Sequence, residues 1–390
     1  MTAATVSRWA RRYVLVGAGS LMAWQAGVVV GVPRRTEVVL GLLGFVLHVV
    51  FGKAYSLVPA YFDRTLTFPR APAVQFPLTV GGVSGLVAAS FDVGPSWVGA
   101  AGALLWTLGV GAFVATVGWT IRGNPTGRET ATGDHNAGRR PVDRLANGFV
   151  PVALLYLLAG TYETLALYAG VPPLFDGYPP QATHLLAAGT AGVLLFSLGF
   201  RLLPRFMVAH PPRWLVGVVL LTGASGPALL ATGVAGGGLL RIGGAVEAVA
   251  VVGYAVAVGT LYHRSERRRV GFVGVLGSAA CGVVGVAVGL WFAFGRPQPS
   301  LAVAHLRLNL LGFLGLAVVG VSYQFYPPSV GTLPAASDRT ALVSIAALAS
   351  GLLAQLVGHV VPVVATFGHL LAFGGAVLYA YLVVAAFRAR

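Results

Sequence analysis

A histidine and an arginine stand two residues apart in a long apolar segment, "AHLRLNLLGFLGLAVVGVSYQFYPP", at 304–328. A charged side chain at the centre of a bilayer costs at least ~2.5 kcal/mol, so such residues usually face a protein interior and act there. Imidazole is the commonest metal ligand, and a guanidinium pairs with carboxylates and phosphates. His305 and Arg307 are therefore the first candidates for a functional site. For Arg307, snorkelling to the membrane surface stays open as an alternative.

The other histidines extend this candidate set. Of the eight histidines, five stand in or beside apolar segments: His48, His184, His305, His359 and His369. Side chains on facing helices of a bundle can share one metal ion or cofactor. The alternative for each histidine is a structural hydrogen bond to a neighbouring helix, and both readings stay open.

The elements that must position these residues are membrane helices. Hydrophobic residues make up 56% of the chain and charged residues 9%, whereas a soluble domain is ~25% charged. We predict an all-α polytopic membrane protein with about twelve spans of roughly 20 residues. The expected spans are 13–32, 37–59, 74–92, 97–121, 148–169, 181–203, 212–233, 238–262, 270–294, 299–325, 340–360 and 362–386.

Arginines predict the orientation of the chain in the cell membrane. They concentrate before the first span, at the end of the chain and in the loops after the even-numbered spans, above all in the loop 122–147. Cytoplasmic loops carry such an excess, so we expect both termini to be cytoplasmic. The net charge of +15 then reflects topology and contact with anionic lipid. With no basic soluble domain, nucleic-acid binding is not expected.

An internal repeat predicts the grouping of the spans. The second, sixth and tenth spans end in "GKAYSLVP", "SLGFRLLP" and "GVSYQFYP". When the prolines are aligned, each span has an aromatic residue at one earlier position and a small residue at another. Small residues permit close helix packing, and we expect each proline to end its helix. We predict one membrane domain, 1–390, built from three four-helix units at about 1–121, 148–262 and 270–390. Chance in a glycine-rich chain is the alternative.

The expected topology also predicts how deep the polar side chains lie. It places His184, His305, His359 and His369 in the outer third of the membrane and His48 near its middle. Three further ionisable residues are expected inside spans and form a possible proton or polar path: Glu163, Glu247 and Lys53. Structural hydrogen bonding is the alternative role for the two glutamates.

The sixth and tenth spans, "THLLAAGTAGVLLFSLGFRLLPRF" and the segment quoted above, carry a resemblance. With twelve spans in three units, the chain resembles the catalytic subunit of haem–copper oxidases and nitric oxide reductases, and their degenerate NnrS-like relatives. The resemblance implies that His184 is a copper ligand and His305 a haem ligand, with His359 or His369 recruited to the metal. It implies that Arg307 stands where the family has a second histidine, beside a haem propionate or in place of a lost haem.

The departures from the family pattern limit what the resemblance implies. The seventh span, "RWLVGVVLLTGASGPALLATG", lacks the histidine pair that completes the family's copper site. A complete oxygen-reducing oxidase is therefore not expected. We expect a haem- or copper-binding membrane protein in nitric oxide or respiratory redox metabolism, with a redox partner or partner subunit. The alternatives are a transporter or channel that uses the same bundle, and a structural protein without cofactors.

Overall fold

The computed structural model describes residues 2–295, 298–358 and 361–389. His359 and Arg296 lie outside the described residues. Within them, every long element is a helix, and twelve helical spans are long and apolar enough to cross a membrane. The prediction of an all-helical chain with twelve membrane spans is confirmed to this extent.

Nine of the spans are single long helices or a long helix with a short one before it. They are α1 (Thr2–Val30), α4 (Ala71–Ser90), α5 (Trp97–Ile121), α6 with α7 (Arg140–Gly148 and Val150–Ala169), α10 (Arg213–Gly233), α11 (Gly238–Arg264), α12 (Val270–Phe294), α15 (Asp338–Val357) and α16 (Pro362–Arg388). Short 3₁₀ turns occur at η2 (Asp134–Arg139) and η5 (Pro328–Val330).

The remaining three spans are the second, sixth and tenth, and each contains a π-helical middle. They run α2–η1–α3 (Arg34–Val38, Val39–Leu47, His48–Tyr61), α8–η3–α9 (Pro180–His184, Leu185–Gly192, Val193–Met207) and α13–η4–α14 (Pro299–Arg307, Leu308–Gly315, Leu316–Phe325). These three spans are the most buried of the twelve, and η1, η3 and η4 contact one another. The core therefore lies where the π-helices meet.

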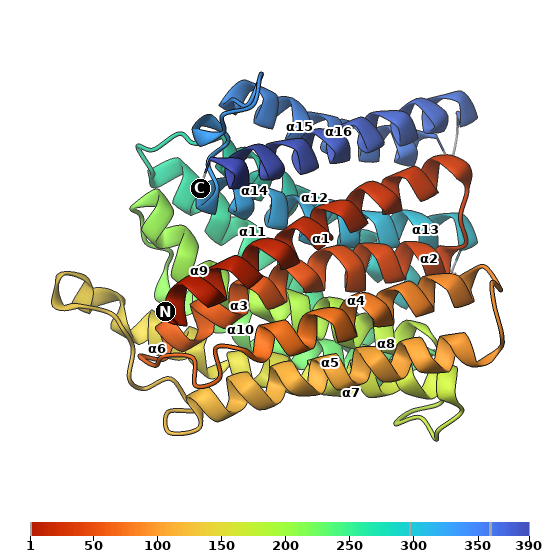
Figure 1. Cartoon of the computed structure of the whole chain (residues 1–390), viewed down its shortest axis with the longest axis horizontal. Helices are drawn as coiled ribbons and strands as arrows, with labels where there is room; N and C mark the ends of the chain where they lie inside the picture. Colours follow the sequence, from red (N-terminus) through yellow and green to blue (C-terminus); the bar gives the residue numbers. More distant parts are fainter. Residues whose placement is uncertain (1, 296–297, 359–360, 390) are drawn as a thin grey trace.

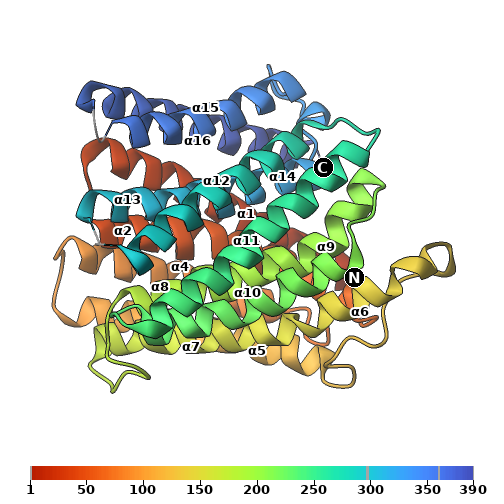
Figure 2. The ribbon, with the colours of Figure 1, turned by 180° about the vertical axis from the view of Figure 1, so that it is seen from behind.

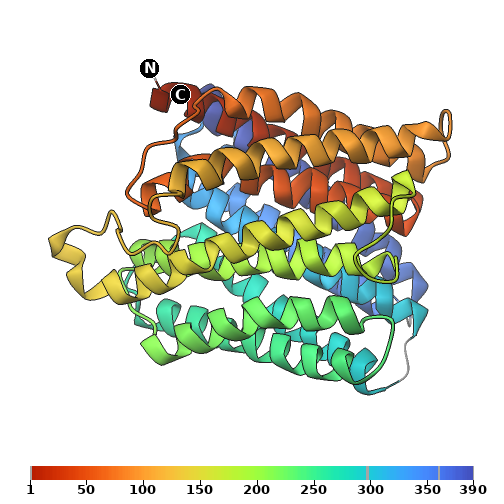
Figure 3. The same cartoon turned by 90° about the horizontal axis from the view of Figure 1, so that it is seen from below.

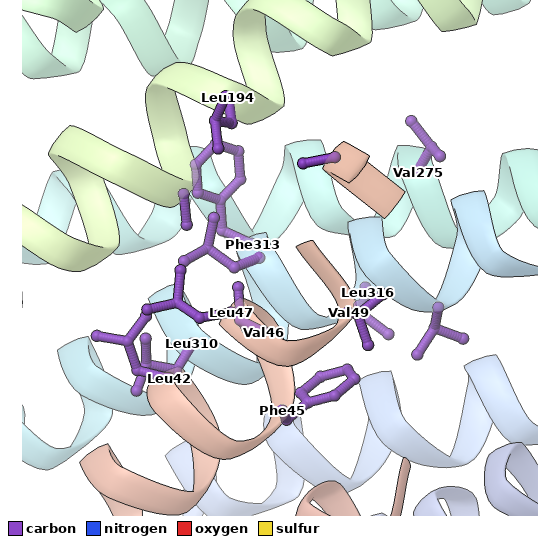
Figure 4. Packing of buried hydrophobic residues seen from close by; sticks show 14 of the residues in the cluster. Leu42, Phe45, Val46, Leu47, Val49, Leu194, Val275, Leu310, Phe313 and Leu316 are labelled. Carbon is purple, nitrogen blue, oxygen red and sulfur yellow. The ribbon is translucent and has the colours of Figure 1, made fainter. Parts of the chain in front are cut away.

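Figure 4 shows this core from close by. Side chains of η1 and η4 interdigitate there, with contributions from α9 and α12. The labelled residues are Leu42, Phe45, Val46, Leu47, Val49, Leu194, Val275, Leu310, Phe313 and Leu316. Large apolar side chains thus fill the middle of the bundle.

The outer helices pack in a pattern that recurs around the core. Helix α4 packs on α5, α10 on α11, and α15 on α16. The contact α5–α7 joins residues 1–121 to 148–262, α11–α12 joins 148–262 to 270–390, and α16–α1 joins 270–390 to 1–121, which closes a ring. Figure 2 shows one part of the ring, where α10, α11 and α12 lie next to one another.

Both chain ends lie at one end of the bundle (Figure 1). Helix α6 and the loop before it project from that same end, as Figure 3 shows. Helices α2, α8 and α13, which carry the polar residues of interest, lie at the opposite end. That the end with both termini faces the cytoplasm stays a prediction.

The prediction that the aligned prolines end their helices is wrong at two of the three positions. Pro59 lies inside α3 and Pro204 inside α9, and only Pro327 follows its helix, α14. A proline lacks the N–H that bonds to the carbonyl four residues earlier, but the residues that follow it keep their N–H groups and can still donate to the preceding turn. The helices therefore continue to Tyr61 and Met207 before they end.

Candidate functional site

Two histidines from different spans face each other near the end of the bundle opposite the termini. His184 is the last residue of α8, and His305 lies in α13. Their ring centroids are 6.4 Å apart, and the rings are nearly parallel, with an interplanar angle of 26°. Both side chains are half-buried. The structure thus brings together the two residues that the resemblance implies as copper and haem ligands.

Hydrogen bonds to the backbone hold both imidazoles. Nδ1 of His184 lies 2.8 Å from the carbonyl oxygen of Pro180, and Nδ1 of His305 lies 3.0 Å from that of Gly285. A carbonyl only accepts, so each Nδ1 must carry the proton and donate it. The Nε2 atom of each ring then keeps its lone pair. Metal-binding histidines are oriented in this way, by donating the other ring N–H to a carbonyl.

Helix α12 leaves room for His305. A Cβ on Gly289 would lie 3.1 Å from Cε1 of His305, and a Cβ on Gly285 would lie 2.9 Å from Oδ1 of Asn309. The ring of Phe292 meets the His305 ring edge to face, at 5.7 Å between centroids. Glycines on one helix and an aromatic ring beyond them therefore set the position of the imidazole.

Arg307 forms the second part of the site, on the other side of α13. Its Nε and Nη2 donate to the two carboxylate oxygens of Glu37, at 2.9 and 2.8 Å. Glu37 belongs to the short helix α2, and its side chain is 4% exposed, against 15% for Arg307. Two parallel charge-assisted bonds of this kind are among the stronger polar contacts in proteins. Arg307 is thus paired with a carboxylate of the protein itself.

Three more spans supply partners to this ion pair. Trp24 of α1 donates to Oε2 of Glu37 at 3.2 Å. Nη1 of Arg307 donates to Oε1 of Gln355 at 3.1 Å, and the same nitrogen lies 3.3 Å from Nε2 of His369. The pair with its partners, which we call the Arg307 cluster, joins α1, α2, α13, α15 and α16. His369 therefore belongs to this cluster and not to the histidine pair.

The two parts of the site occupy different faces of one helix. Residues two apart on a helix point in directions that differ by ~200°. His305 accordingly turns toward α12 and α8, whereas Arg307 turns toward α2, α15 and α16. The two residues that stand together in the sequence thus serve separate sites.

The three residues of the predicted polar path have different surroundings. Oε1 of Glu163 accepts from the backbone N–H of Leu174 at 2.6 Å, which fixes the loop after α7. Glu247 is buried in α11 against Gly226 of α10, where a Cβ would lie 2.5 Å from its Oε2. Lys53 donates to the hydroxyl of Tyr326 at 2.8 Å. The partners observed for the three residues are thus different ones.

Sequence reasoning missed the residues that complete both parts. Glu37 stands in the turn "GVPRRTE", where it looks like a surface charge, and Gln355 and Asn309 are neutral. The available signal was the need for a counter-ion: an arginine inside a span requires one, and Glu37 begins the span that packs next to it. No three histidine, cysteine or acidic side chains among the described residues form a complete metal cluster. The histidine pair thus offers two ligands.

No family model matches the chain, and no curated protein matches its sequence.

Proposed function

We propose that this membrane protein binds one transition-metal ion between His184 and His305. The observation that carries the proposal is the pair of parallel imidazoles, 6.4 Å apart, with both Nδ1 atoms engaged by backbone carbonyls. Two imidazoles on one ion, with bonds of about 2.0 Å, place their ring centroids about 5–6.5 Å apart. The separation supports a single ion held by both residues.

The donor set favours an ion that accepts nitrogen ligands. Imidazole suits copper, zinc, iron and nickel, and among these the resemblance to the oxidase superfamily favours copper. Asn309, whose amide nitrogen lies 3.3 Å from Nδ1 and 3.5 Å from Nε2 of His305, is a polar side chain beside the pair that could orient a further ligand. With two protein nitrogens, the remaining coordination positions would be open to small molecules. Nitric oxide or respiratory redox metabolism is the role that the resemblance implies for such an ion.

A haem does not fit this arrangement. The resemblance implies a haem on His305 and copper on His184, which requires a porphyrin as well as a second metal beside the two rings. A gap of 6.4 Å between ring centroids has no room for both. Arg307, at the position where the family has its second histidine, is engaged by Glu37 and Gln355. We therefore propose a metal ion without haem.

We further propose that the bundle consists of three four-helix units with both termini in the cytoplasm. Three kinds of observation support the units: the recurring helix pairs, the closed ring of contacts, and the π-helix at one place in the second, sixth and tenth spans. The arginine-rich loop 122–147 and both termini share one end of the bundle, which agrees with the charge-based orientation in the cell membrane.

Metal analysis of the purified full chain tests the proposal. We expect one copper or zinc ion per chain after incubation and dialysis, and no absorption band of haem. His184→Ala and His305→Ala should each lower the metal affinity at least tenfold, whereas His210→Ala, in a polar loop, should leave it unchanged. Retained thermal stability of the variants separates loss of a ligand from loss of the fold.

Two outcomes would overturn the metal proposal. One is a metal content unaffected by either alanine substitution. The other is a colourless, metal-free protein that binds a small solute, which would favour the transporter hypothesis. In that case the Arg307 cluster, which contains a buried charge pair between spans, becomes the first place to look for the solute.

A further inference from the structure

A cavity of about 540 Å³ lies between α1 and α4, away from the histidine pair. Its walls are apolar, with valines from both helices, and two serines, Ser20 and Ser84, are its small polar residues. Pockets for small molecules have volumes of about 300–1,000 Å³ and mostly apolar walls with few polar groups. The cavity thus has the size and character of a ligand site.

The mouth of the cavity opens sideways from the bundle. Gly19 and Ala23 of α1 and Ser84 of α4 line it and are exposed. These residues lie inside the two membrane spans Ala4–Val30 and Ala71–Ser90, well away from the helix ends. The surroundings at this depth are lipid chains. The cavity also reaches Val93 in the loop after α4, but a molecule that enters between Gly19 and Ser84 comes from the bilayer.

One ionisable side chain lines the cavity. His48, at the start of α3, is fully buried, and its Nδ1 lies 2.7 Å from the carbonyl oxygen of Leu43. Nδ1 therefore carries the proton, and Nε2 is left as an acceptor. Among the described residues, no partner is found for this buried Nε2. A buried polar atom without a hydrogen-bond partner costs about 1–3 kcal/mol. A partner from outside the chain is therefore expected for Nε2 of His48.

A second buried polar atom without a partner among the described residues belongs to a ring that packs beside His48. The ring of Trp106 is 6.2 Å from that of His48 between centroids, and its Nε1–H has no partner among the described residues. Gly82 of α4 lets Trp106 approach, since a Cβ there would lie 2.7 Å from the tryptophan backbone nitrogen. A hydroxyl group both donates and accepts, and so matches an unpaired acceptor beside an unpaired donor.

We propose that the cavity between α1 and α4 binds a lipid-soluble alcohol or phenol from the bilayer, whose hydroxyl donates to Nε2 of His48. The apolar body of the ligand lies against the valines, and its tail leaves between Gly19 and Ser84. The site is independent of the proposed metal, because its residues come from α1, η1, α3, α4 and the loop after α4, and none belongs to the histidine pair.

Binding of labelled probes to the full chain in lipid nanodiscs tests this proposal. The probes are a short-chain benzoquinol as the phenol, the corresponding benzoquinone, which has no hydroxyl donor, and farnesol as the alcohol. We expect saturable binding of the quinol or of farnesol, and binding of the quinone at least tenfold weaker than that of the quinol. Preference between the quinol and farnesol identifies the kind of hydroxyl compound.

Two variants locate the binding. Gly19→Phe should abolish it, because a Cβ on Gly19 meets no atom within 4 Å and the ring can fill the cavity. His48→Leu removes the acceptor and should weaken binding at least tenfold, whereas His48→Gln, which keeps an acceptor oxygen, should restore part of it. Gly111→Phe is the matched control, a glycine of α5 that also has open space and does not line the cavity.

Three results would overturn the proposal. The first is that no probe binds saturably, in which case water satisfies His48 and Trp106. The second is equal binding of quinol and quinone, which removes the role of the hydroxyl donor. The third is binding that is insensitive to Gly19→Phe in a variant that melts like the parent protein, which places the ligand elsewhere.

Discussion

At the scale of single residues, the structure explains how an arginine is accommodated inside a membrane span. Arg307 meets Glu37 through two parallel hydrogen bonds and uses its remaining nitrogen for Gln355 and His369. Each charge offsets the desolvation of the other. Removing one partner of such a pair leaves an uncompensated buried charge and costs about 3–5 kcal/mol.

The first prediction concerns this ion pair. Arg307→Gln and Glu37→Gln should each lower the free energy of unfolding by about 3–5 kcal/mol. The double variant should be no less stable than either single variant, because no unpaired charge remains. Unfolding by steric trapping in bicelles measures all three. Arg34→Gln is the control, since Arg34 is exposed on the same short helix as Glu37.

Additive losses in the double variant would contradict this account, because residues that form one pair must show coupling. Metal content measured on the same samples separates the two sites. The Arg307 variants should retain the ion, since His305 and Arg307 point to opposite sides of α13.

At the scale of the elements, the three inner spans use glycine to approach the outer helices. Each π-helix holds two glycines: Gly41 and Gly44 in η1, Gly189 and Gly192 in η3, and Gly312 and Gly315 in η4. Gly44, Gly189 and Gly312 occupy one aligned position. A Cβ there would collide with Ser20 of α1, Tyr156 of α7 and Cys281 of α12, respectively.

The second prediction follows from the approach of η4 to α12. A Cβ on Gly312 would lie 2.6 Å from Cβ of Cys281 and 2.9 Å from Cδ2 of Leu352. Gly312→Ala should therefore destabilise the protein by roughly 1–3 kcal/mol through overpacking. Gly118→Ala, in α5, has open space within 4 Å and should leave stability unchanged or raise it by up to about 1 kcal/mol. Thermal unfolding in one detergent compares them, and equal midpoints would contradict the role of the glycine.

At the scale of the whole molecule, a buried polar network lies at the end that carries both termini. Asp143 of α6, 1% exposed, accepts from Arg205 of α9 at 2.6 Å and from Thr132 at 2.5 Å. Arg201, 2% exposed, donates to Oδ1 of Asn147 at 2.5 Å and to the backbone of Tyr61 at 2.8 Å. The end of the loop 122–147 is thus held against α9 and α3. Counting arginines for the orientation of the chain did not reveal these contacts.

The third prediction concerns topology. Reporters inserted in the loop 122–144 and after Arg390 should both report the cytoplasm, and one inserted at 171–181 should report the outside. The reason is the excess of arginines at the end of the bundle that holds the loop and the termini. Enzymatic reporters of opposite sidedness make the measurement. Opposite locations for the first two would imply an odd number of spans between them and contradict the twelve-span structure.

The sequence by itself determined the class of the protein, the number of spans and their approximate bounds. Hydropathy and span length are local properties, so a window of about 20 residues is enough to recognise a membrane helix. The aligned ends of the second, sixth and tenth spans predicted close helix packing, and these are the helices that form the core. The small residues seen there, Gly52 and Gly320, do lie against α1 and α12.

Only the tertiary structure decided which polar side chains meet. His184 faces His305, whereas His369, at a similar expected depth, joins Arg307 and Glu37. These pairings depend on the rotation of each helix about its axis and on which helices are neighbours. Both are set by packing between residues far apart in the chain, such as the contacts among η1, η3 and η4, and periodicity within one segment carries no record of them.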